Sequence, residues 1–322
     1  MKQLIIYFFI AFNFLFSNTI YHVPINGTID LGLPPYIERS IKEAERNNAE
    51  SIIFEINTFG GRVDAATQIK DAILDSKVPT VAFINKRAIS AGALISLSCE
   101  KIYMTGGATI GATTAVDMSG NKASEKVISY MREEMAATAE KRGRNKHIAR
   151  GMVDEELEFP NKVKNKYVTS DSEVDTIKTI LYYLIMENDT IYVDDIEGRK
   201  QGNLITLTTE QALKYGIADN SADTFNSVLD SLGFSTANVQ TTSENWSENF
   251  VRFLTNPVVA SLLTTFGFLG ILFELQSPGW GIPGSIGLMC LILSLGASYI
   301  AELATMNDFL IIVIGLLCIM LE

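Results

Sequence analysis

The distribution of apolar residues constrains this chain more than any other feature of its sequence. Three apolar runs follow one another near the C-terminus, from Pro257 to Phe273, from Ile286 to Ile300 and from Phe309 to Leu321. A helix needs roughly 20 apolar residues to cross a bilayer, and each run approaches that length. Buried core helices are the alternative, but three consecutive runs with almost no charge favour a membrane. We therefore predict an all-α transmembrane segment over residues 256–322.

A further apolar run, from Leu4 to Phe16, lies at the N-terminus and ends beside a plausible cleavage site at Ser17. It is too short for a stable span, so we predict a secretory signal peptide over residues 1–18, with an uncleaved anchor as the alternative. No Lys or Arg follows Arg252, and the positive-inside rule therefore does not orient the C-terminal helices. Export then places the middle of the chain outside the cytoplasm.

Charge and cysteine content exclude several classes of protein. The 26 basic and 37 acidic residues give a net charge of −11, and no basic stripe is present to bind a phosphate backbone. We expect no nucleic-acid partner. The three cysteines are far apart and form no C-x-x-C pattern, so neither a disulfide framework nor a structural zinc site fits. We predict no metal and no cofactor.

Residues 19–235 alternate strand-like and helix-like segments. Short β-rich runs occur at residues 51–57, 79–85 and 101–104. Strands that alternate with short helices predict βαβ units and an α/β core. Apolar side chains at helical spacing follow the first run, at Ala65, Ile69, Ala72 and Ile73.

Another amphipathic helix is predicted further along the chain, with Ser124 as its N-cap. The Thr, Ser, Asn and Gln content of residues 236–255 is typical of a linker to the membrane segment. The apolar residues of the predicted helix recur every four positions, at Val127, Met131, Met135 and Ala139.

Two glycine-containing turns follow two consecutive predicted strands, and each opens a helix. Gly60 and Gly61 let the backbone approach a substrate without Cβ interference. Ser90 opens the second helix beside Ala91, where N–H groups at a helix N-terminus suit a developing oxyanion. Such a serine is a candidate nucleophile for acyl transfer. Most serines in this position cap helices instead.

A serine nucleophile needs a base, and the chain has two histidines, His22 and His147. Neither has an obvious carboxylate partner in the sequence, which makes a Ser-His-Asp triad doubtful. A lysine serves as base when burial lowers its pKa from about 10.4 toward neutrality. Lys126 lies in the first turn of the predicted helix, where the helix dipole acts in the same direction, and Lys86 and Lys122 are its rivals.

Several motifs, taken in order, resemble those of the NfeD family of ClpP-like membrane serine proteases, also called stomatin operon partner proteins. The resemblance runs from about residue 20 to the end of the chain. Its motifs are N-T-F-G-G at 57–61, A-I-S-A-G at 88–92, G-G-A-T-I-G-A at 106–112, G-R-N at 143–145, L-T-T-E-Q-A-L-K-Y-G-I-A-D at 207–219 and G-W-G-I-P-G at 279–284.

This resemblance implies a ClpP- or crotonase-like α/β spiral domain with a Ser-Lys dyad. Ser90 matches the family nucleophile and Lys126 matches its base, upstream of the G-R-N motif. The glycine pair Gly60–Gly61 and Ala91 match the oxyanion hole. The family acts on hydrophobic segments of membrane proteins, with stomatin-like proteins as substrates or partners. We therefore expect a peptide or membrane-protein substrate, contact with membrane lipid and a homo-oligomer in the bacterial inner membrane.

Three departures from the family accompany the match. Phe59 replaces a proline, which is predicted to loosen the turn that aims the Gly61 N–H. Residues 161–203, including a predicted helical stretch from Val174 to Met186, form a longer connection than usual. The small C-terminal β-barrel of full-length members does not follow, and the chain stops inside its third apolar run at Glu322, which indicates a truncated or split product.

Two other functions stay open from the sequence. A non-catalytic membrane partner or scaffold for a stomatin-like protein would use the same fold for binding alone. An acyl-CoA enzyme of the crotonase type would use a similar oxyanion hole, although export from the cytoplasm disfavours CoA thioesters as substrates.

Overall fold

The chain divides into two compact units in its computed structural model, and parts of the chain lie outside the described residues. One unit comprises Met1–Ile29 and Glu38–Thr242, and the other comprises Asp30–Ile37 and Ser243–Glu322. The predicted signal peptide and the third apolar run lie outside the described residues. The structure describes residues 18–114, 121–155, 183–186, 189–192, 203–276 and 281–300.

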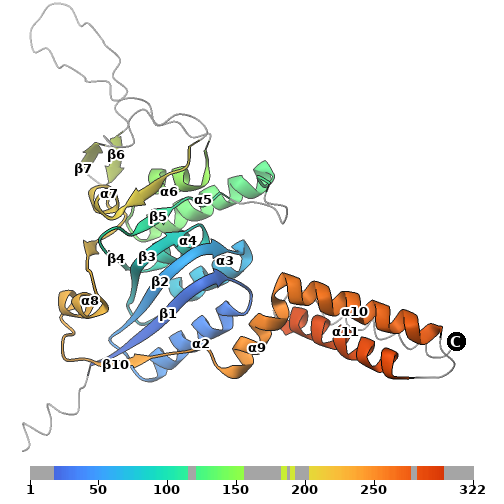
Figure 1. Ribbon diagram of the computed structural model, residues 1–322. Coiled ribbons are helices and arrows are strands. Elements are labelled where there is room, and N and C mark those ends of the chain that lie inside the picture. The colour runs from blue at the N-terminus through green and yellow to red at the C-terminus, as the bar shows by residue number, and fades with distance from the viewer. Residues whose placement is uncertain are drawn as a thin grey trace, which may run out of the picture. The chain divides into compact units, whose positions relative to one another are not determined.

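An eight-stranded sheet forms the centre of the first unit (Figure 1). The strands are β1 Thr19–Ile29, β2 Ser51–Gly61, β3 Thr80–Ile89, β4 Lys101–Met104, β5 Thr109–Gly111, β8 Thr206–Thr208, β9 Asn220–Ser221 and β10 Asn238–Thr241. Strands β10, β1, β2, β3, β4 and β9 lie side by side in that order, and each pairs in parallel with the next. β5 pairs with β3, and β8 pairs antiparallel with β5.

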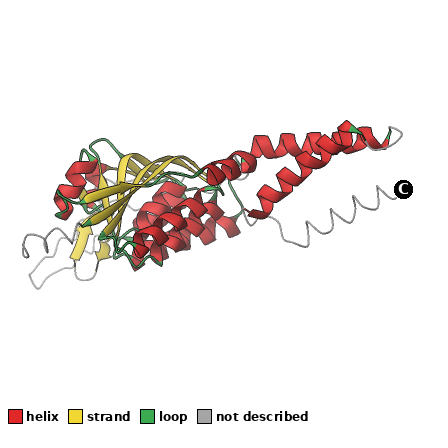
Figure 2. Cartoon of the chain, turned by 90° about the horizontal axis from the view of Figure 1, so that it is seen from below, coloured by secondary structure: helices red, strands yellow, loops and turns green. Residues whose placement is uncertain are grey.

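Helices fill the connections between these strands. Figure 2 shows a helical layer packed beneath one face of the sheet. The alternation of parallel strands and helices confirms the predicted α/β core of βαβ units. The helices up to residue 232 are α2 Leu33–Arg46, α3 Val63–Leu74, α4 Ala91–Ser98, α5 Glu125–Lys141, α6 Lys146–Val153, α7 Thr209–Lys214 and α8 Phe225–Leu232.

Strand β2 shows why the sheet forms at this place in the sequence. Its residues Ile52, Ile53 and Phe54 have no exposed surface, although successive side chains point to opposite faces. A parallel sheet is buried on both faces, so its strands are continuously apolar. Ile53 packs into a cluster with Phe83 of β3 and Val228 of α8, which covers part of the second face.

Strand β3 has two partners in succession on the side away from β2. Its first half, Val81 to Ile84, pairs with β4, and its second half, Arg87 to Ile89, pairs with β5. The register sets Ile89 opposite Gly111, the last residue of β5. The end of β5 therefore lies beside the connection between β3 and α4.

The two helices predicted from apolar spacing are both present. In α3, Ala65, Ile69 and Ile73 are buried as expected, whereas Ala72 is half-buried. In α5, Met131, Met135 and Ala139 are buried, but Val127 is 39% exposed and Ile128 is buried instead. A strict four-residue step drifts off the 3.6-residue period of a helix, which explains the difference at Val127. Ser124 occupies the N-cap position without a side-chain capping hydrogen bond.

Two stretches of the chain carry different elements from those predicted. Tyr183–Met186 is strand β6, which pairs antiparallel with β7, Asp189–Tyr192, so the prediction of a helix through Met186 is wrong over these residues. Aromatic and β-branched residues, which favour strands, dominate this hairpin. Residues 236–255 were expected to be a linker, yet they contain β10 and the helix α9, Trp246–Thr255. The first unit accordingly continues through Thr242.

Arg144 joins separate parts of the first unit through its buried guanidinium. Its Nε donates to the Ile217 carbonyl at 3.0 Å, and its terminal nitrogens donate to the carbonyls of Cys99 and Glu100 at 3.0 Å each. A further bond of 2.8 Å reaches the Asp219 carboxylate. One side chain thus fixes the end of α5 to the sheet at β4 and to the loop before β9. The planar fork of donors suits arginine and no other cation.

We expect Arg144→Leu to lower the free energy of unfolding by about 3 kcal/mol, because three carbonyls, two of them buried, and a carboxylate lose their donor. Arg150→Leu is the matched control, since Arg150 pairs with Glu133 at the surface and such pairs contribute about 0–1 kcal/mol. Thermal unfolding of the full chain in detergent, followed by circular dichroism, measures both. Equal losses for the two variants would contradict this role for Arg144.

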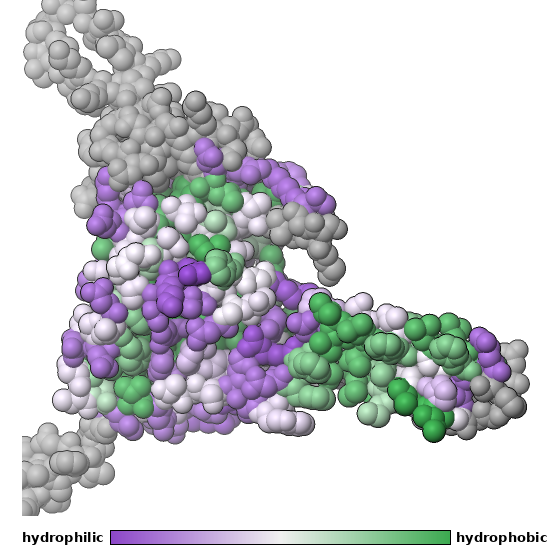
Figure 3. Space-filling view, in the orientation of Figure 1, coloured by the Kyte–Doolittle hydropathy of each residue, from purple (hydrophilic) through white to green (hydrophobic). Residues whose placement is uncertain are grey.

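The second unit contains two apolar helices, α10, Pro257–Leu275, and α11, Ile282–Ile300. Among the described residues, α10 is long and apolar enough to cross a membrane, with a mean hydropathy of 2.0. The apolar part of α11, Ile282–Ala297, is shorter. Figure 3 shows hydrophobic residues gathered over the surface of these two helices.

The two helices form a hairpin in which glycines permit close contact. A Cβ added at Gly270 would lie 2.7 Å from the Gly287 Cα and 2.7 Å from the Pro283 carbonyl oxygen. At the loop end of the hairpin, the buried Glu274 carboxylate accepts the backbone N–H groups of Gly281 and Gly284. Small residues are enriched where membrane helices meet, because apolar burial against lipid-like neighbours supplies no drive for association.

Gly270→Ala should therefore destabilise the hairpin by about 1–3 kcal/mol through steric overpacking. Gly296→Ala is the control, because a Cβ at Gly296 in α11 meets nothing within 4 Å. Both changes raise helix propensity by about the same amount, so their difference isolates the clash. Unfolding of the full chain in detergent compares them, and a Gly270→Ala variant as stable as Gly296→Ala would refute the close packing.

Candidate functional site

Ser90 lies in a strained turn between β3 and α4. Its backbone angles are φ 55° and ψ −119°, a conformation that side-chain-bearing residues rarely adopt. Such conformations cost about 1–3 kcal/mol and persist only where the surroundings enforce them. Here the Ser90 N–H donates to the Gly111 carbonyl at 2.9 Å, and the Ser90 carbonyl accepts the Ala93 N–H at 2.9 Å.

The hydroxyl of Ser90 is not used as a helix cap. Ser90 occupies the N-cap position of α4, but its side chain makes no capping hydrogen bond. All eight residues of α4 are buried, so the serine stands at the end of a rigid helix. A strained strand-to-helix turn that leaves a serine hydroxyl unobstructed is the arrangement of a nucleophile elbow. The main competing explanation for this serine, helix capping, therefore does not apply.

The glycine turn at the end of β2 lies directly against Ser90. A Cβ at Gly60, where φ is 104°, would be 2.5 Å from the Ser90 Cβ and 3.0 Å from its Oγ. A Cβ at Gly92 would be 2.5 Å from the Thr58 methyl group. A Cβ at Gly61 would be 2.0 Å from the Ile29 carbonyl oxygen. Only glycine fits at these positions, and the Gly60 turn lies against Ser90, which Ala91 follows in the chain.

Thr58 organises this turn, a role that the sequence pattern did not predict. Its Oγ1 donates to the Gly27 carbonyl at 2.5 Å and accepts the Gly60 N–H at 2.9 Å. The Gly60 N–H is thereby engaged within the turn. Thr58 lies inside the N-T-F-G-G motif. A polar, β-branched side chain in a motif that ends a strand was the sequence feature that could have indicated its role.

A second strained segment supports the Ser90 turn. A Cβ at Gly111 would lie 2.3 Å from the Ile205 carbonyl oxygen, and Ala112 has a positive φ of 46°. The Ala112 N–H donates to the same Ile205 carbonyl at 2.9 Å. Gly111 in turn provides the carbonyl that holds Ser90. The G-G-A-T-I-G-A motif contains both residues, although its role was not predicted.

Lys126 lies apart from this arrangement. It is exposed on the first turn of α5, and within the described part of the chain its amine contacts neither a carboxylate nor the Ser90 hydroxyl. Its rival Lys122 pairs with Glu155 at 2.6 Å, and Lys86 is exposed on β3. A general base must reach the hydroxyl that it deprotonates. Among the described residues, the Ser90 turn and the glycine turn thus meet without a lysine beside them.

His22 has a carboxylate partner, which the sequence did not reveal. Its Nε2 lies 2.8 Å from Glu55 Oε2, and Asn85 donates to the other Glu55 oxygen at 2.6 Å. The hydrogen bond with His22 holds the pKa of Glu55 below its usual value. Glu55 precedes Gly60 on β2 by about 16 Å at 3.3 Å per residue, so this pair does not belong to the Ser90 turn. His147 lies on α6, where burial lowers its pKa.

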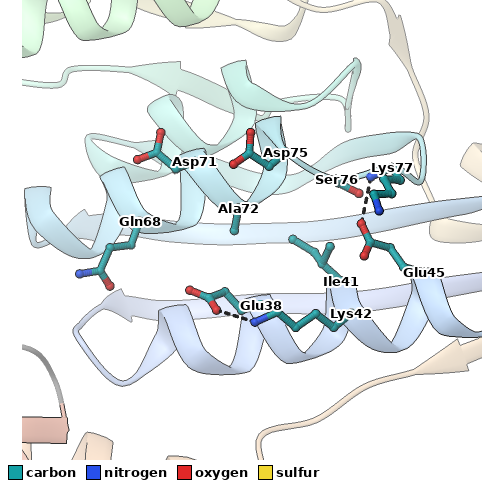
Figure 4. A pocket seen from close by; sticks show the side chains of 10 residues that line it. All are labelled: Glu38, Ile41, Lys42, Glu45, Gln68, Asp71, Ala72, Asp75, Ser76 and Lys77. Carbon is teal, nitrogen blue, oxygen red and sulfur yellow. Dashed lines mark hydrogen bonds and ion pairs between the residues drawn. The ribbon is translucent and has the colours of Figure 1, made fainter.

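A separate groove of about 450 Å³ opens between α2 and α3 (Figure 4). Two of the carboxylates that line it are already hydrogen-bonded. The Lys42 amine donates to Glu38 at 3.1 Å, and the Lys77 backbone N–H donates to Glu45 at 3.0 Å. Ser90 and the glycine turn are not among its lining residues. Among the described residues, no group of three His, Cys, Asp or Glu side chains is arranged to hold a metal ion.

Gly60→Ala tests whether the two turns are as close as described. We expect it to lower the free energy of unfolding by about 2 kcal/mol more than Gly233→Ala does. Gly233 is the control because it has a similar positive φ of 81° at the end of α8, with open space around a Cβ. Both variants carry the left-handed backbone penalty, and only the first adds a clash. Equal unfolding temperatures for the full-length variants would contradict the contact.

Comparison with known proteins assigns both parts of the chain. The family described as "NfeD1b, N-terminal domain" matches residues 19–178, and the "NfeD integral membrane domain" matches residues 258–322. The chain is 34% identical to membrane protein NfeD1b of Bacillus subtilis over 95% of its length. It is 26% identical to membrane-bound protease PH1510 of Pyrococcus horikoshii over 91% of its length. The chain spans 62% and 61% of these two relatives.

Solved structures similar to this one include the 1510-N membrane-bound stomatin-specific protease. A lysine-to-alanine mutant of that protein, in complex with a substrate peptide, matches 74% of this chain and 99% of its own with a TM-score of 0.54 and 24% identity. A serine-to-alanine mutant matches 71% of this chain with a TM-score of 0.52. These likenesses confirm the predicted ClpP-like α/β fold.

Proposed function

Since the chain belongs to the NfeD family of membrane proteins, we propose that it is a membrane-anchored serine endopeptidase with a dyad of Ser90 and Lys126. The observation that carries the proposal is the strained turn of Ser90, whose hydroxyl caps no helix and lies against the glycine turn of β2. A scaffold protein has no use for that strain. Functional sites are where strained backbone is retained.

The proposed reaction uses Ser90, the amides at its turn and the amine of Lys126. Ser90 Oγ attacks the peptide carbonyl carbon while its proton passes to the amine of Lys126. The carbonyl oxygen becomes an oxyanion that accepts the N–H groups of Gly61 and Ala91, and each such donor lowers the barrier by about 3–4 kcal/mol. The protonated lysine then gives its proton to the leaving amine. Water hydrolyses the resulting serine ester by the same steps and frees Ser90.

Lys126 has to approach Ser90 for this reaction to proceed. Within the described part of the chain its amine is engaged by no carboxylate, so its movement breaks no ion pair. In the proposed active state, bound substrate within a homo-oligomer shields the amine from water and places it against the hydroxyl. Shielding from water disfavours the charged form of a lysine, as a base requires.

The substrate we propose is an extended, apolar peptide segment of a membrane protein. Pairing between β2 and β3 ends at Thr58 and Ala88, whereas pairing with β1 continues to Gly61. The edge of β2 beyond Thr58 is therefore available for strand addition beside Ser90. Phe59, on this edge, is 73% exposed, and the Arg87 guanidinium stacks on its ring at 4.4 Å. An exposed ring beside the nucleophile supports an apolar substrate.

The partner and the location follow from the relatives. Proteins named as stomatin-specific proteases are similar to this chain, which supports a stomatin-like membrane protein as substrate or partner. We propose a multi-pass protein of the bacterial inner membrane whose protease domain lies on the extracytoplasmic side. The predicted signal peptide would direct that orientation.

Ser90→Ala and Lys126→Ala should each abolish cleavage of an apolar peptide by the full chain in lipid vesicles. Lys122→Ala and Lys86→Ala are the matched controls and should retain the wild-type rate, because neither lysine serves as the base. Peptide hydrolysis followed by mass spectrometry measures all four. Full activity in either Ser90→Ala or Lys126→Ala would refute the dyad.

The pH dependence of the same reaction provides a second readout. The rate should rise with pH as the amine base loses its proton, and a flat profile from about pH 5 to 9 would count against a lysine base. A fluorophosphonate probe distinguishes the enzyme from the non-catalytic partner that the separation of Lys126 from Ser90 favours. Labelling of wild type but not of Ser90→Ala supports the enzyme, and absence of labelling supports the partner.

A further inference from the structure

The short helix α9 has its charged side facing the protein and its aromatic side facing outward. It is capped by Asn245, whose side chain accepts the Glu248 N–H at 2.8 Å, while the Glu248 carboxylate accepts the Asn245 N–H at 2.7 Å. Glu248 is 8% exposed, so this acidic residue is buried at the base of the helix. In a water-exposed helix the charged residues face solvent instead.

Arg252 occupies the same inward side of α9. Its guanidinium bonds to the Asp30 carboxylate at 2.8–2.9 Å and also to Glu244. These residues all belong to the second unit. The cation is satisfied by two carboxylates of the protein itself. α9 therefore presents no unpaired cation that would draw it to an anionic surface.

The outward side of α9 carries three aromatic residues at helical spacing. Trp246 is 79% exposed, Phe250 is 38% exposed and Phe253 is 59% exposed. Steps of four and three residues place all three on one face of a helix. The Trp246 and Phe250 rings stack with centroids 5.3 Å apart and planes inclined by 6°. These three exposed rings form an apolar face of the helix, here called the α9 aromatic face.

This face is continuous with the membrane helix. A single residue, Asn256, separates the end of α9 from Pro257, where α10 begins. α10 exposes apolar side chains from its first turn onward, with Val258 67% exposed and Leu262 51% exposed. Tryptophan and other aromatics are enriched where a membrane protein passes through the lipid headgroup layer, because one side of the ring system is apolar and the indole N–H stays hydrogen-bonded.

We propose that the α9 aromatic face binds the headgroup layer of the bilayer as an interfacial anchor that precedes the first span. The interaction is apolar and aromatic rather than electrostatic, because Arg252 is already paired. It is independent of the proposed protease activity. A neighbouring protein or a second copy of the chain that covers the same face is the competing occupant.

Tryptophan fluorescence tests this in the full chain, since Trp246 and Trp280 are its two tryptophans. In the Trp280→Phe variant, Trp246 is the sole emitter. After reconstitution into phosphatidylcholine vesicles, its emission should be blue-shifted and protected from aqueous acrylamide. Phosphatidylcholine brominated near the headgroup should quench most of the emission, and lipid brominated near the bilayer centre should quench much less.

Three results would overturn the proposal. Free access of acrylamide to Trp246, with no quenching by either brominated lipid, would place the ring in water. Protection from acrylamide without lipid quenching would place it against another protein chain. A strong gain in lipid quenching when phosphatidylglycerol is added would show an electrostatic attachment. The Trp246→Phe variant, which retains Trp280, corrects for any change in reconstitution between samples.

Discussion

The candidate site depends on one steric constraint: two backbone turns approach each other more closely than any side chain would permit. The turn at the end of β2 and the turn between β3 and α4 meet at Gly60 and Ser90, and Gly92 lies against Thr58. A third segment, at Gly111, holds the Ser90 N–H. The strain of Ser90 persists because hydrogen bonds on both sides leave it no alternative conformation. The register of three parallel strands thus positions one hydroxyl.

The site is unequally prepared for chemistry. The serine and the amides around it are supported by buried strands and by a fully buried helix, so their geometry is preorganised. Lys126, by contrast, stands on an exposed helical turn. In the function we propose, the strained turn of Ser90 is built into the fold. The proton acceptor, Lys126, reaches the serine only when its part of α5 moves. Substrate and self-association then control the rate, since they decide whether the amine leaves water.

Local sequence patterns predicted most of the helices and strands. They did not predict which residues far apart in the sequence lie close together in the fold. The β-rich runs at 51–57 and 79–85 were evident because strands buried on both faces are continuously apolar. The apolar faces of α3 and α5 were evident because burial imposes a helical period on the sequence. The partner of His22 was not, since Glu55 comes from another strand and only the register brings them together. Thr58 and Gly111 were likewise missed as site residues, because their roles are hydrogen bonds to residues far away along the chain. Strand β6 fell within a predicted helical stretch because a short apolar run fits both periods.

Glycine serves both units, for different physical reasons. In the first unit it lets backbone approach a serine whose hydroxyl must stay open. In the hairpin of α10 and α11, Gly270 and Gly287 let two apolar helices touch where burial alone would not hold them together. Arg252 is the last Lys or Arg of the chain, and it lies just before the apolar helix α10. Its charge is neutralised by Asp30 and Glu244 before the first span begins, as a charge near a medium of low dielectric must be. The aromatic residues of α9 can then face outward at that boundary, because no charge on the helix has to follow them.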